Sequence, residues 1–484
     1  MKYLMILAIL LPALAAVGFS SKKISENLSV LHKYVFGFVL ANSVLLWILV
    51  FGPQVDKLPL LRFTDTLQFV LNVDGMSRVF IMIISVLWPL TTLYAFDYMA
   101  HEGGEPKFYM FFLLSYSVST GVALAGNMVT LYMFFELLTL ATLPLVMHKM
   151  DDKARYAGKR YLVYSMIGAS LGFISLIFLQ AYGSGGDFRL GGILGNVNPK
   201  IINTLRIAFV LAFFGFGVKA ALLPMSFWLP AASVAPTPVT ALLHAAAVVK
   251  AGAFACIRLT YYSFGTEILR GTFAQYIPMC AAIATIVIGS FLALRSQHLK
   301  RRLAWSTVSN LSYILFAVLI MTDMGLKGAC MHMWAHALIK STLFFGVGCV
   351  MVCSGKEYLD EIGGMAGIMP VTFGCFTLAA AALMGIPPMP GFFSKWSIGT
   401  AAAAAGGGLE IAGIAALMIS AFLTAVYLMT IVSKAYFPAD RKLLKGPSIE
   451  KPWMKRVMIT LCCIIVAMGL CSGLIETTLT RWLF

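Results

Sequence analysis

The sequence predicts an all-α polytopic membrane protein, and three observations support this fold class. Of its 484 residues, 60% are hydrophobic and only 12% are charged. The mean hydropathy of +0.88 lies above the range of soluble globular domains. Apolar runs long enough to cross about 30 Å of hydrocarbon recur from end to end, and we count about fourteen of them.

Each apolar run is expected to form one transmembrane helix. The runs lie near 2–19, 30–52, 76–98, 108–126, 128–147, 161–182, 203–223, 236–260, 276–294, 303–321, 327–353, 369–406 with an interruption, 408–433 and 457–474. The first run lacks a small-residue cleavage pattern and is interpreted as a retained helix. The longest polar connections, near 183–202 and 437–456, are too short for separate domains, so residues 1–484 are expected to form one membrane domain.

The net charge of +16 orients the chain in a lipid bilayer and implies no nucleic-acid partner. Most of the 36 lysine and arginine residues lie in alternate loops. These are Lys22, Lys23, Lys33, Lys107, Lys149, Lys153, Arg155, Lys159, Arg160, Arg295, Lys300, Arg301, Arg302, Lys356, Lys434, Arg441, Lys442, Lys445, Lys451, Lys455 and Arg456. Basic loops face the cytoplasm, so both termini are expected on the non-cytoplasmic side of the cell membrane.

Two of the runs are broken by proline, and each break lies beside a lysine. The first is "GFGVKAALLPMSFWLP", residues 215–230, which contains Lys219, and the second is "GIPPMPGFFSKWS", residues 385–397, which contains Lys395. Proline lacks a backbone N–H and frees a helix carbonyl. Paired interruptions of this kind predict an internal repeat with ion sites near the midplane. The prolines are Pro224 and Pro230 in the first break and Pro387, Pro388 and Pro390 in the second.

A carboxylate within an apolar run offers a partner for the first lysine. Glu136 is the only charge in "LYMFFELLTLATLPL", residues 131–145. A charge at the bilayer centre costs about 2.5–3.5 kcal/mol on insertion scales, and an ion pair between Glu136 and Lys219 would offset that cost for both groups. A lysine in such a pair can gain and lose protons, and the alternative is a static contact between two helices.

A histidine and lysine stripe follows in "MHMWAHALIKSTLFF", residues 331–345. His332, His336 and Lys340 recur at i, i+4 and i+8 and are expected on one face of a helix. Imidazole both donates and accepts protons near neutral pH, so the stripe favours a proton relay. Two histidines four positions apart also suit zinc, but the sequence shows no obvious third ligand nearby.

One further apolar run carries both a histidine and a lysine. In "PTPVTALLHAAAVVKAGAFA", residues 236–255, His244 and Lys250 are six positions apart and lie on different sides of a helix, where they can contact two neighbours. The predicted ion path runs through Glu136, Lys219, Lys250 with His244, His336 and Lys340, and Lys395, with water or hydroxyl groups between them.

No cofactor or metal site is predicted. The nine cysteines contain no CxxC pair and are interpreted as small apolar residues. The chain has no Walker loop and no GxGxxG motif after a strand. Energy is therefore expected from an ion gradient or from a partner, and the chain holds no redox or catalytic centre of its own.

At these residues the chain resembles the proton-translocating antiporter-like family. This family comprises the three large membrane-arm subunits of complex I, the large subunits of Mrp-type sodium/proton antiporters and their relatives in membrane-bound hydrogenases. The similar stretches run in family order over about residues 75–435. They are "FFELLTLATLPLV" (134–146), "KAALLPMSFWLPAA" (219–232), "PTPVTALLHAAAVVKAG" (236–252), "LKRRLAWSTVSNLSYI" (299–314), "HMWAHALIKSTLFF" (332–345) and "GIPPMPGFFSK" (385–395).

The resemblance implies fourteen transmembrane helices with two inverted five-helix repeats, at 108–260 and 276–433, each with one broken helix. It implies Glu136 and Lys219 as a gating ion pair, Lys250 as the central connector, and Lys395 as the group that faces the exit. It also implies that the stripe of His332, His336 and Lys340 is a relay. Some relatives carry glutamate in place of Lys395, and many carry histidine in place of Ser226, so no proton role transfers to that serine.

The expected function is ion translocation within a multi-subunit energy-converting complex, in which the chain moves protons or exchanges protons for sodium. The partners are expected to be other membrane subunits, including further antiporter-like or small ones. The chain ends soon after its last run, without the lateral helix of the largest complex I subunit, which favours an Mrp or hydrogenase context. Two alternatives remain open, a stand-alone secondary transporter of a small organic substrate and a metalloenzyme using His332 and His336.

Overall fold

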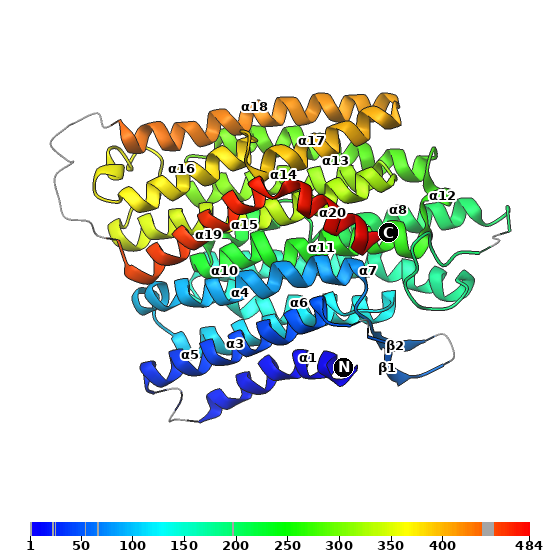
Figure 1. The fold of residues 1–484 in the computed structure, drawn as a ribbon, viewed down its shortest axis with the longest axis horizontal. Coiled ribbons are helices and arrows are strands. Elements are labelled where there is room, and N and C mark those ends of the chain that lie inside the picture. The colour runs from blue at the N-terminus through cyan, green and yellow to red at the C-terminus, as the bar shows by residue number, and fades with distance from the viewer. Residues whose placement is uncertain are drawn as a thin grey trace.

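The computed structural model describes residues 2–21, 24, 26–53, 55–64, 67–195, 198–437 and 450–484. Its helices lie roughly side by side along one direction (Figure 1). They are α1 (Lys2–Val17), α3 (Leu28–Phe51), α4 (Gly75–Glu102), α5 (Glu105–Ala123), α6 (Met128–Val146), α7 (Asp152–Tyr182), α8 (Ile202–Gly217), α9 (Trp228–Ala231), α10 (Thr237–Ala241), α11 (Val248–Ile257), α12 (Thr266–Leu269), α13 (Phe273–Arg295), α14 (Leu299–Leu319), α15 (Asp323–Ser354), α16 (Pro370–Met384), α17 (Pro390–Ala405), α18 (Gly408–Tyr436), α19 (Pro452–Leu470) and α20 (Ser472–Leu483).

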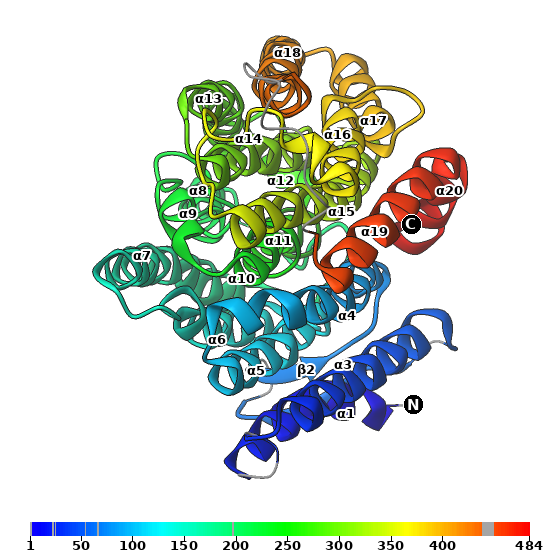
Figure 2. The ribbon, with the colours of Figure 1, turned by 90° about the vertical axis from the view of Figure 1, so that its left-hand side faces the viewer.

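The bundle has a buried centre and a lipid-facing rim. Seen end-on, α10, α11, α14 and α15 occupy the middle, while α1 and α3 lie at one edge and α13 and α18 at the other (Figure 2). Within the described residues, nine helices are long and apolar enough to span a membrane. Burial is complete for the apolar window of Thr237–Phe264 and reaches 78% for that of Asp323–Ser354, so the two central spans are largely shielded from lipid. The chain is a multi-pass membrane protein.

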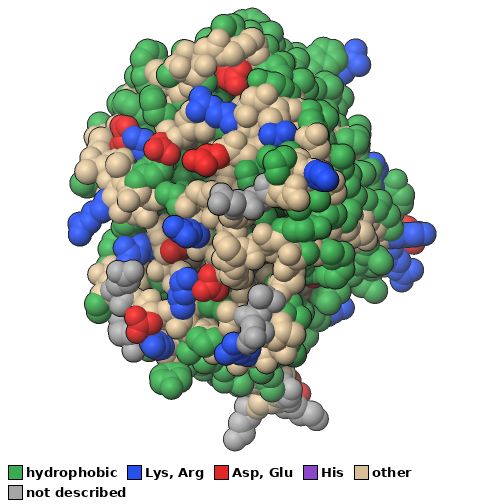
Figure 3. Space-filling view, turned by 90° about the vertical axis from the view of Figure 1, so that its right-hand side faces the viewer, with side chains coloured by type: hydrophobic (Ala, Val, Ile, Leu, Met, Phe, Trp, Pro, Cys, Tyr) green, Lys and Arg blue, Asp and Glu red, His purple; other side chains and the backbone are tan. Residues whose placement is uncertain are grey.

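Charged side chains gather at the two ends of the bundle. One end carries the surface hollow bordered by Lys149, Lys153, Lys300 and Arg301, and we call it the basic end. Figure 3 shows the opposite end, where side chains of both charges are mixed and hydrophobic side chains cover the flanks. Lys22, Lys23 and the basic residues at 441, 442 and 445 lie outside the described residues.

Both chain ends lie at the end opposite the basic one. The Lys2 ammonium is 3.2 Å from the Asp56 carboxylate, just before the first strand. Near the other terminus, a Cβ added at Gly75 would meet the backbone of Trp482. The termini therefore share one end of the bundle, toward the right in Figure 1.

A small sheet departs from the predicted all-α class. Strands β1 (Leu58–Arg62) and β2 (Gln68–Leu71) pair antiparallel. Two hydrogen bonds dock this hairpin on the start of α6, from the Asn127 amide to the Gln68 carbonyl at 2.7 Å and from the Val70 N–H to the Thr130 hydroxyl at 2.8 Å. The hairpin lies in the loop between two apolar runs, and its five- and four-residue strands are too short to span a bilayer.

The apolar run near 236–260 is not a regular helix. It contains π-helical segments at Leu242–Ala246 and Arg258–Phe264, on either side of α11. The first of them closes with a hydrogen bond from the Ala247 N–H to the Leu242 carbonyl, 2.8 Å long. Such segments are rare and often lie at functional sites. The sequence pattern did not indicate them, because the apolar periodicity of a π turn differs little from that of an α turn over a few residues.

The two proline-containing runs are interrupted where the sequence predicts. Helix α8 ends at Gly217, and irregular turns lead to α9, whose first turn contains Pro230. Helix α16 ends at Met384, and α17 begins at Pro390, a position that suits proline because the first helical N–H has no partner within the helix. Each break brings helix ends and turns into the interior of the bundle, where the lysines lie.

Candidate functional site

The first break brings Lys219 against Glu136. Helix α6 carries Glu136, and Asn127 caps this helix by accepting a hydrogen bond from the Thr130 N–H. Lys219 Nζ lies 3.6 Å from Glu136 Oε1, with the lysine side chain 1% exposed and the glutamate 28% exposed. The two charges lie close enough to offset part of each other's desolvation.

Further contacts stabilise the Lys219 amine and the turn after α8 that carries it. Lys219 Nζ donates to the Phe135 carbonyl and lies 3.6 Å from the centroid of the Phe135 ring. The Trp228 indole donates to the Val218 carbonyl at 2.8 Å. The Val218 carbonyl, which lies in the irregular backbone of this break, therefore has a hydrogen-bond donor, as a buried carbonyl requires.

The turn at Lys219 packs directly on α11, the helix that carries Lys250. A Cβ added at Gly252 would lie 2.4 Å from the Ala220 nitrogen and 2.8 Å from the Lys219 carbonyl carbon. Only glycine permits this approach. Across the described part of the chain, no hydrogen bond or ion pair joins the Lys219 and Lys250 side chains, and the close approach is made by Gly252 and the backbone of Lys219 and Ala220.

Lys250 reaches across to the second half of the chain. Its Nζ lies 2.6 Å from His336 Nδ1 on α15. The rings of His336 and His332 have centroids 5.9 Å apart. All three side chains are at most 1% exposed. This contact between an amine and an imidazole joins the helix after the first break to the stripe of histidines.

The stripe leads to the second break. His332 Nδ1 lies 3.0 Å from the hydroxyl of Ser394, the residue before Lys395. Lys395 Nζ donates to the carbonyls of Leu383 at 2.6 Å and Met384 at 3.0 Å. These carbonyls end α16, where the helix dipole is negative and a cation is stabilised.

A cavity opens beside Lys395. It has a volume of about 470 Å³ and is bordered by Lys395, Trp396 and Thr400 on α17 and by Leu417 and Met418 on α18. The Lys219 side chain, by contrast, is only 1% exposed. The second lysine therefore borders open volume, whereas the first is enclosed by protein.

His244 and Lys250 both contact α15, at positions eight residues apart on that helix. His244 Nε2 lies 3.5 Å from the Ser233 hydroxyl, and the His244 ring packs on Phe344 with centroids 4.7 Å apart. Ser233 borders the hollow of the basic end, which has a volume of about 230 Å³. His244 thus lies one hydroxyl away from a surface opening.

The same hollow contains a histidine outside the spans. Burial lowers the pKa of His298, and the Glu357 carboxylate 3.4 Å away only partly opposes this shift. His298 Nδ1 has no hydrogen-bond partner. A neutral imidazole at pH 7 therefore faces the hollow beside Lys300 and Arg301.

Lys340 does not lie between the histidines and Lys395. Its Nζ donates to the Ser306 hydroxyl at 2.6 Å and to the Leu303 carbonyl at 3.1 Å, both on α14. At 100° per residue, position i+8 is rotated by about 80° from position i, so the end of the stripe turns toward another helix. The Lys340 ammonium therefore contacts α14, and not Lys395 as the predicted order of the path would place it.

Several polar contacts of this region were not singled out from the sequence. They belong to hydroxyl groups, such as Ser394 beside Lys395, Ser306 beside Lys340 and Ser233 beside His244. Serine is common at packed helix surfaces in membranes, so its presence in a run is a weak signal. For Ser394, its position directly before Lys395 is a sequence signal that would have indicated a polar contact at the second break.

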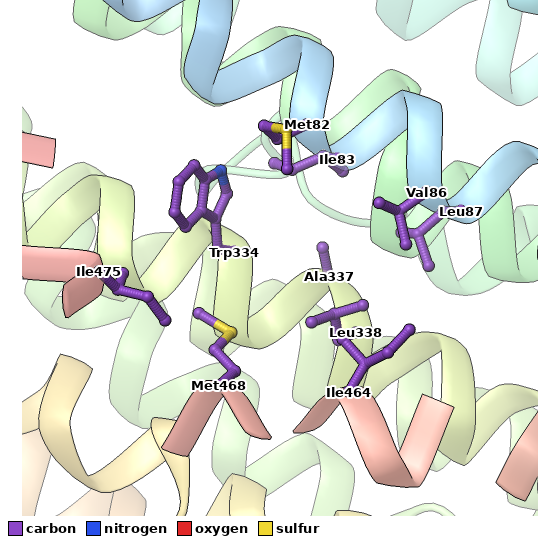
Figure 4. A pocket seen from close by; sticks show the side chains of 10 residues that line it. All are labelled: Met82, Ile83, Val86, Leu87, Trp334, Ala337, Leu338, Ile464, Met468 and Ile475. Atoms are coloured by element: carbon purple, nitrogen blue, oxygen red, sulfur yellow. The ribbon is translucent and has the colours of Figure 1, made fainter. Parts of the chain in front are cut away.

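An apolar pocket of about 230 Å³ lies on the opposite side of α15. Figure 4 shows Trp334, Ala337 and Leu338 of α15 facing it, together with side chains of α4, α19 and α20. It contains no ionisable side chain. This pocket therefore takes no part in the polar arrangement.

The alternative of a metal site at His332 and His336 requires further ligands close to these two side chains. Within the described residues, no group of three or more His, Cys, Asp or Glu side chains is placed to hold a metal ion. Among the described residues, no hydrogen-bond partner lies beside the Nε2 atoms of His332 and His336. Their neighbours are instead an amine, a hydroxyl and each other.

Comparison with known proteins gives consistent results. Residues 125–424 match the family described as NADH:quinone oxidoreductase/Mrp antiporter, TM. The L subunit of the NADH-quinone oxidoreductase of Mycobacterium tuberculosis is 30% identical over 97% of this chain and 71% of the relative. The N subunit of the same enzyme from Desulforudis audaxviator is 32% identical over 76% of this chain and 72% of the relative.

A third relative is much longer than this chain. It is the A/B component of a probable K(+)/H(+) antiporter of Rhizobium meliloti, 33% identical over 68% of this chain, which spans only 32% of the relative. Two solved structures share the fold over 99% of the chain. They are a component of the archaeal membrane-bound sulfane sulfur reductase, with a TM-score of 0.87 at 23% identity, and one of the Mrp complex from Dietzia, with a TM-score of 0.84 at 20% identity.

Proposed function

The chain belongs to the NADH:quinone oxidoreductase/Mrp antiporter transmembrane family, and we propose that it translocates ions as a membrane subunit of a multi-subunit energy-converting complex. The proposed cargo is protons, or protons exchanged for sodium. The relatives named above are subunits of such complexes. The partners are then other membrane subunits, and any electron transfer belongs to them.

The contact between Lys250 and His336 carries this proposal. It links a lysine in the first half of the chain to a histidine in the second at 2.6 Å, with both side chains shielded from lipid. A contact that only holds two helices together does not require two groups that both exchange protons. An amine next to an imidazole can pass a proton in either direction.

The remaining buried groups take roles along this connection. In our proposal Glu136 and Lys219 form a gate whose charge state changes during transport, and Lys250 passes protons to His336 and His332. Lys395 receives them through Ser394 and releases them into the cavity of 470 Å³ beside it. The hollow at the basic end, with Ser233 and His244, is the proposed entry.

The architecture proposed for this function has two inverted repeats, at 108–260 and 276–433, within about fourteen spans. In this arrangement α8 with α9, and α16 with α17, are the broken helices. The basic end is proposed to face the cytoplasm and both termini the opposite side of the cell membrane.

Ion flux in vesicles that contain the intact complex tests the proposal. We expect proton movement, measured with a trapped pH indicator, and we expect sodium counter-transport only if the parent complex is an antiporter. The matched preparation contains this chain alone and is expected to be inactive. Transport of an organic solute by the chain alone would instead support a stand-alone transporter.

A further inference from the structure

Lys340 is the start of an ordered series of hydroxyl groups. Its ammonium donates to the Ser306 hydroxyl at 2.6 Å. Ser306 Oγ lies 2.6 Å from the Tyr427 hydroxyl, which donates to Thr424 Oγ1 at 3.1 Å. All four side chains have an exposed fraction of 0%. The series leads from α15 through α14 to α18.

The hydrogen bonds in this series all point the same way. An ammonium group has no acceptor capacity, so Lys340 donates. Tyr427 donates to Thr424, and Ser306 therefore donates to Tyr427. When Lys340 passes a proton to Ser306, the hydroxyl proton of Ser306 moves to Tyr427 and that of Tyr427 moves to Thr424. Thr424 in turn rotates its own hydroxyl proton off the Ser420 carbonyl and releases it toward the Ser420 hydroxyl through a bridging water molecule. Each hydroxyl ends with one proton, and rotation resets the series.

The series continues along the seam between α14 and α18. Thr424 Oγ1 bonds the Ser420 carbonyl at 2.7 Å, and the Ser420 hydroxyl lies 3.0 Å from that of Ser309 and 2.6 Å from that of Ser290. The Thr424 and Ser420 side chains are one helical turn apart, about 5–6 Å, a distance that a water molecule can span. The steps from Lys340 to Thr424, and those from Ser420 to Ser309 and Ser290, are direct contacts.

The seam ends beside the same two groups as the histidine route. Tyr313 lies on α14 and points its hydroxyl at the Leu417 carbonyl, 3.4 Å away, one turn from Ser420. The Tyr313 ring stacks on His332 with centroids 5.3 Å apart, and Lys395 Nζ lies 5.7 Å from its centroid. Two series of polar groups therefore converge between α14, α15 and α17.

Arg302 places a permanent positive charge between the α14–α18 seam and the basic end. Arg302, which is 2% exposed, donates to the Tyr427 carbonyl at 3.0 Å and to the Thr430 hydroxyl at 2.7 Å. A guanidinium stays protonated at any physiological pH and repels an excess proton. A proton on Tyr427 therefore has a lower barrier toward Ser420 than toward the basic surface.

We propose that Ser306, Tyr427 and Thr424 form a second proton-carrying branch that connects Lys340 through the α14–α18 seam to Tyr313 and Lys395. This branch runs parallel to the His332–Ser394 route, and it rests on the proposed function. With two parallel routes, loss of either one leaves transport through the other. The branch assigns a role to Lys340, which the histidine route does not use.

The test combines Tyr427→Phe with His332→Ala in the intact complex in vesicles. Removing the Tyr427 hydroxyl keeps the ring and its packing but interrupts the series, so each single variant is expected to lower proton flux roughly two- to threefold and the double variant at least tenfold. In the His332→Ala background, Tyr427→Phe is also expected to change the flux ratio between H₂O and D₂O. Assembly is checked by size-exclusion chromatography.

Tyr94→Phe is the matched control. Tyr94 is equally buried, and its hydroxyl donates to the Phe345 carbonyl on α15 at 2.8 Å and contacts the Cys349 thiol, both of which lie outside the series. It is expected to leave flux unchanged in either background. A double variant of Tyr427 and His332 with the same flux as His332→Ala would overturn the branch alone. A wild-type complex without proton flux would overturn the proposed function and the branch together.

Discussion

The two lysine-bearing breaks differ in how their charge is held. Lys219 is enclosed, with Glu136 at 3.6 Å and a carbonyl of α6 as a second partner. Lys395 has no carboxylate partner within the described residues, and it rests on the Leu383 and Met384 carbonyls at the edge of a 470 Å³ cavity. The same sequence pattern thus produces one charge-compensated lysine and one lysine beside open space. The first suits a gate and the second suits release.

Lys219→Ala is expected to have the largest effect in this comparison. It leaves Glu136 without its cation, and breaking one partner of a buried pair costs about 3–5 kcal/mol when both groups are fully buried, less here because the glutamate is partly exposed. We expect ion flux in vesicles to fall to background while the complex still assembles. Normal flux in this variant would refute the gate.

The matched control for this prediction is Lys327→Ala. Lys327 also faces a carboxylate, that of Glu476 at 3.8 Å, but the two side chains are 21% and 57% exposed. Partly exposed pairs contribute about 0–1 kcal/mol. Flux and assembly of this variant are expected to match the wild type.

Lys395→Ala is expected to block release, with flux reduced at least tenfold because no titratable group remains beside the cavity. Lys395→Glu is expected to recover part of the flux, since a carboxylate also exchanges protons. Flux is measured in the same vesicles, with both variants at equal protein content. Equal activity of the alanine variant and the wild type would remove Lys395 from the path.

The double variant His336→Ala with Lys340→Ala tests the connection between the two breaks. It removes the partner of Lys250 and the start of the hydroxyl series, so both routes toward Lys395 lose their origin. We expect flux to fall about tenfold or more, with each single variant milder. Unchanged rates in the double variant would show that ions bypass α15.

Gly252→Ala is expected to have the smallest effect of this series. The added Cβ would lie 2.4 Å from the Ala220 nitrogen and would push α11 away from the Lys219 turn. Overpacking of this kind costs about 1–3 kcal/mol, and we expect a lower melting temperature and a flux reduced by severalfold. Gly374→Ala is the control, since a Cβ at Gly374 meets nothing within 4 Å. Equal melting temperatures for the two variants would contradict the close approach.

Much of the fold could be predicted from apolar runs and prolines. The predicted interruptions coincide with the ends of α8 and α16, because proline acts on its own backbone and needs no tertiary context. The β1–β2 hairpin was missed because it depends on docking to Asn127 and Thr130 on α6. The π-helical turns around α11 were missed because a π turn of a few residues leaves almost the same apolar pattern as an α turn.

At the site, too, some residues could be predicted from the sequence and others depend on contacts between helices. Glu136, Lys219 and Lys395 stand out because a charge in an apolar run is costly, and the structure places the first two 3.6 Å apart. The orientation of Lys340 could not be derived from spacing alone, since it depends on Ser306 of a neighbouring helix. Hydroxyl partners become visible only when the helices that carry them are placed side by side.

The connection between the two breaks is tested most directly by proton and sodium flux through the intact complex carrying Lys250→Ala, since Lys250 joins the halves at His336 Nδ1, 2.6 Å away. An assembled complex that no longer moves either ion, while a Tyr94→Phe complex transports normally, is the result that a continuous buried route predicts. Full transport by the Lys250→Ala complex would show that ions cross without passing between the two halves.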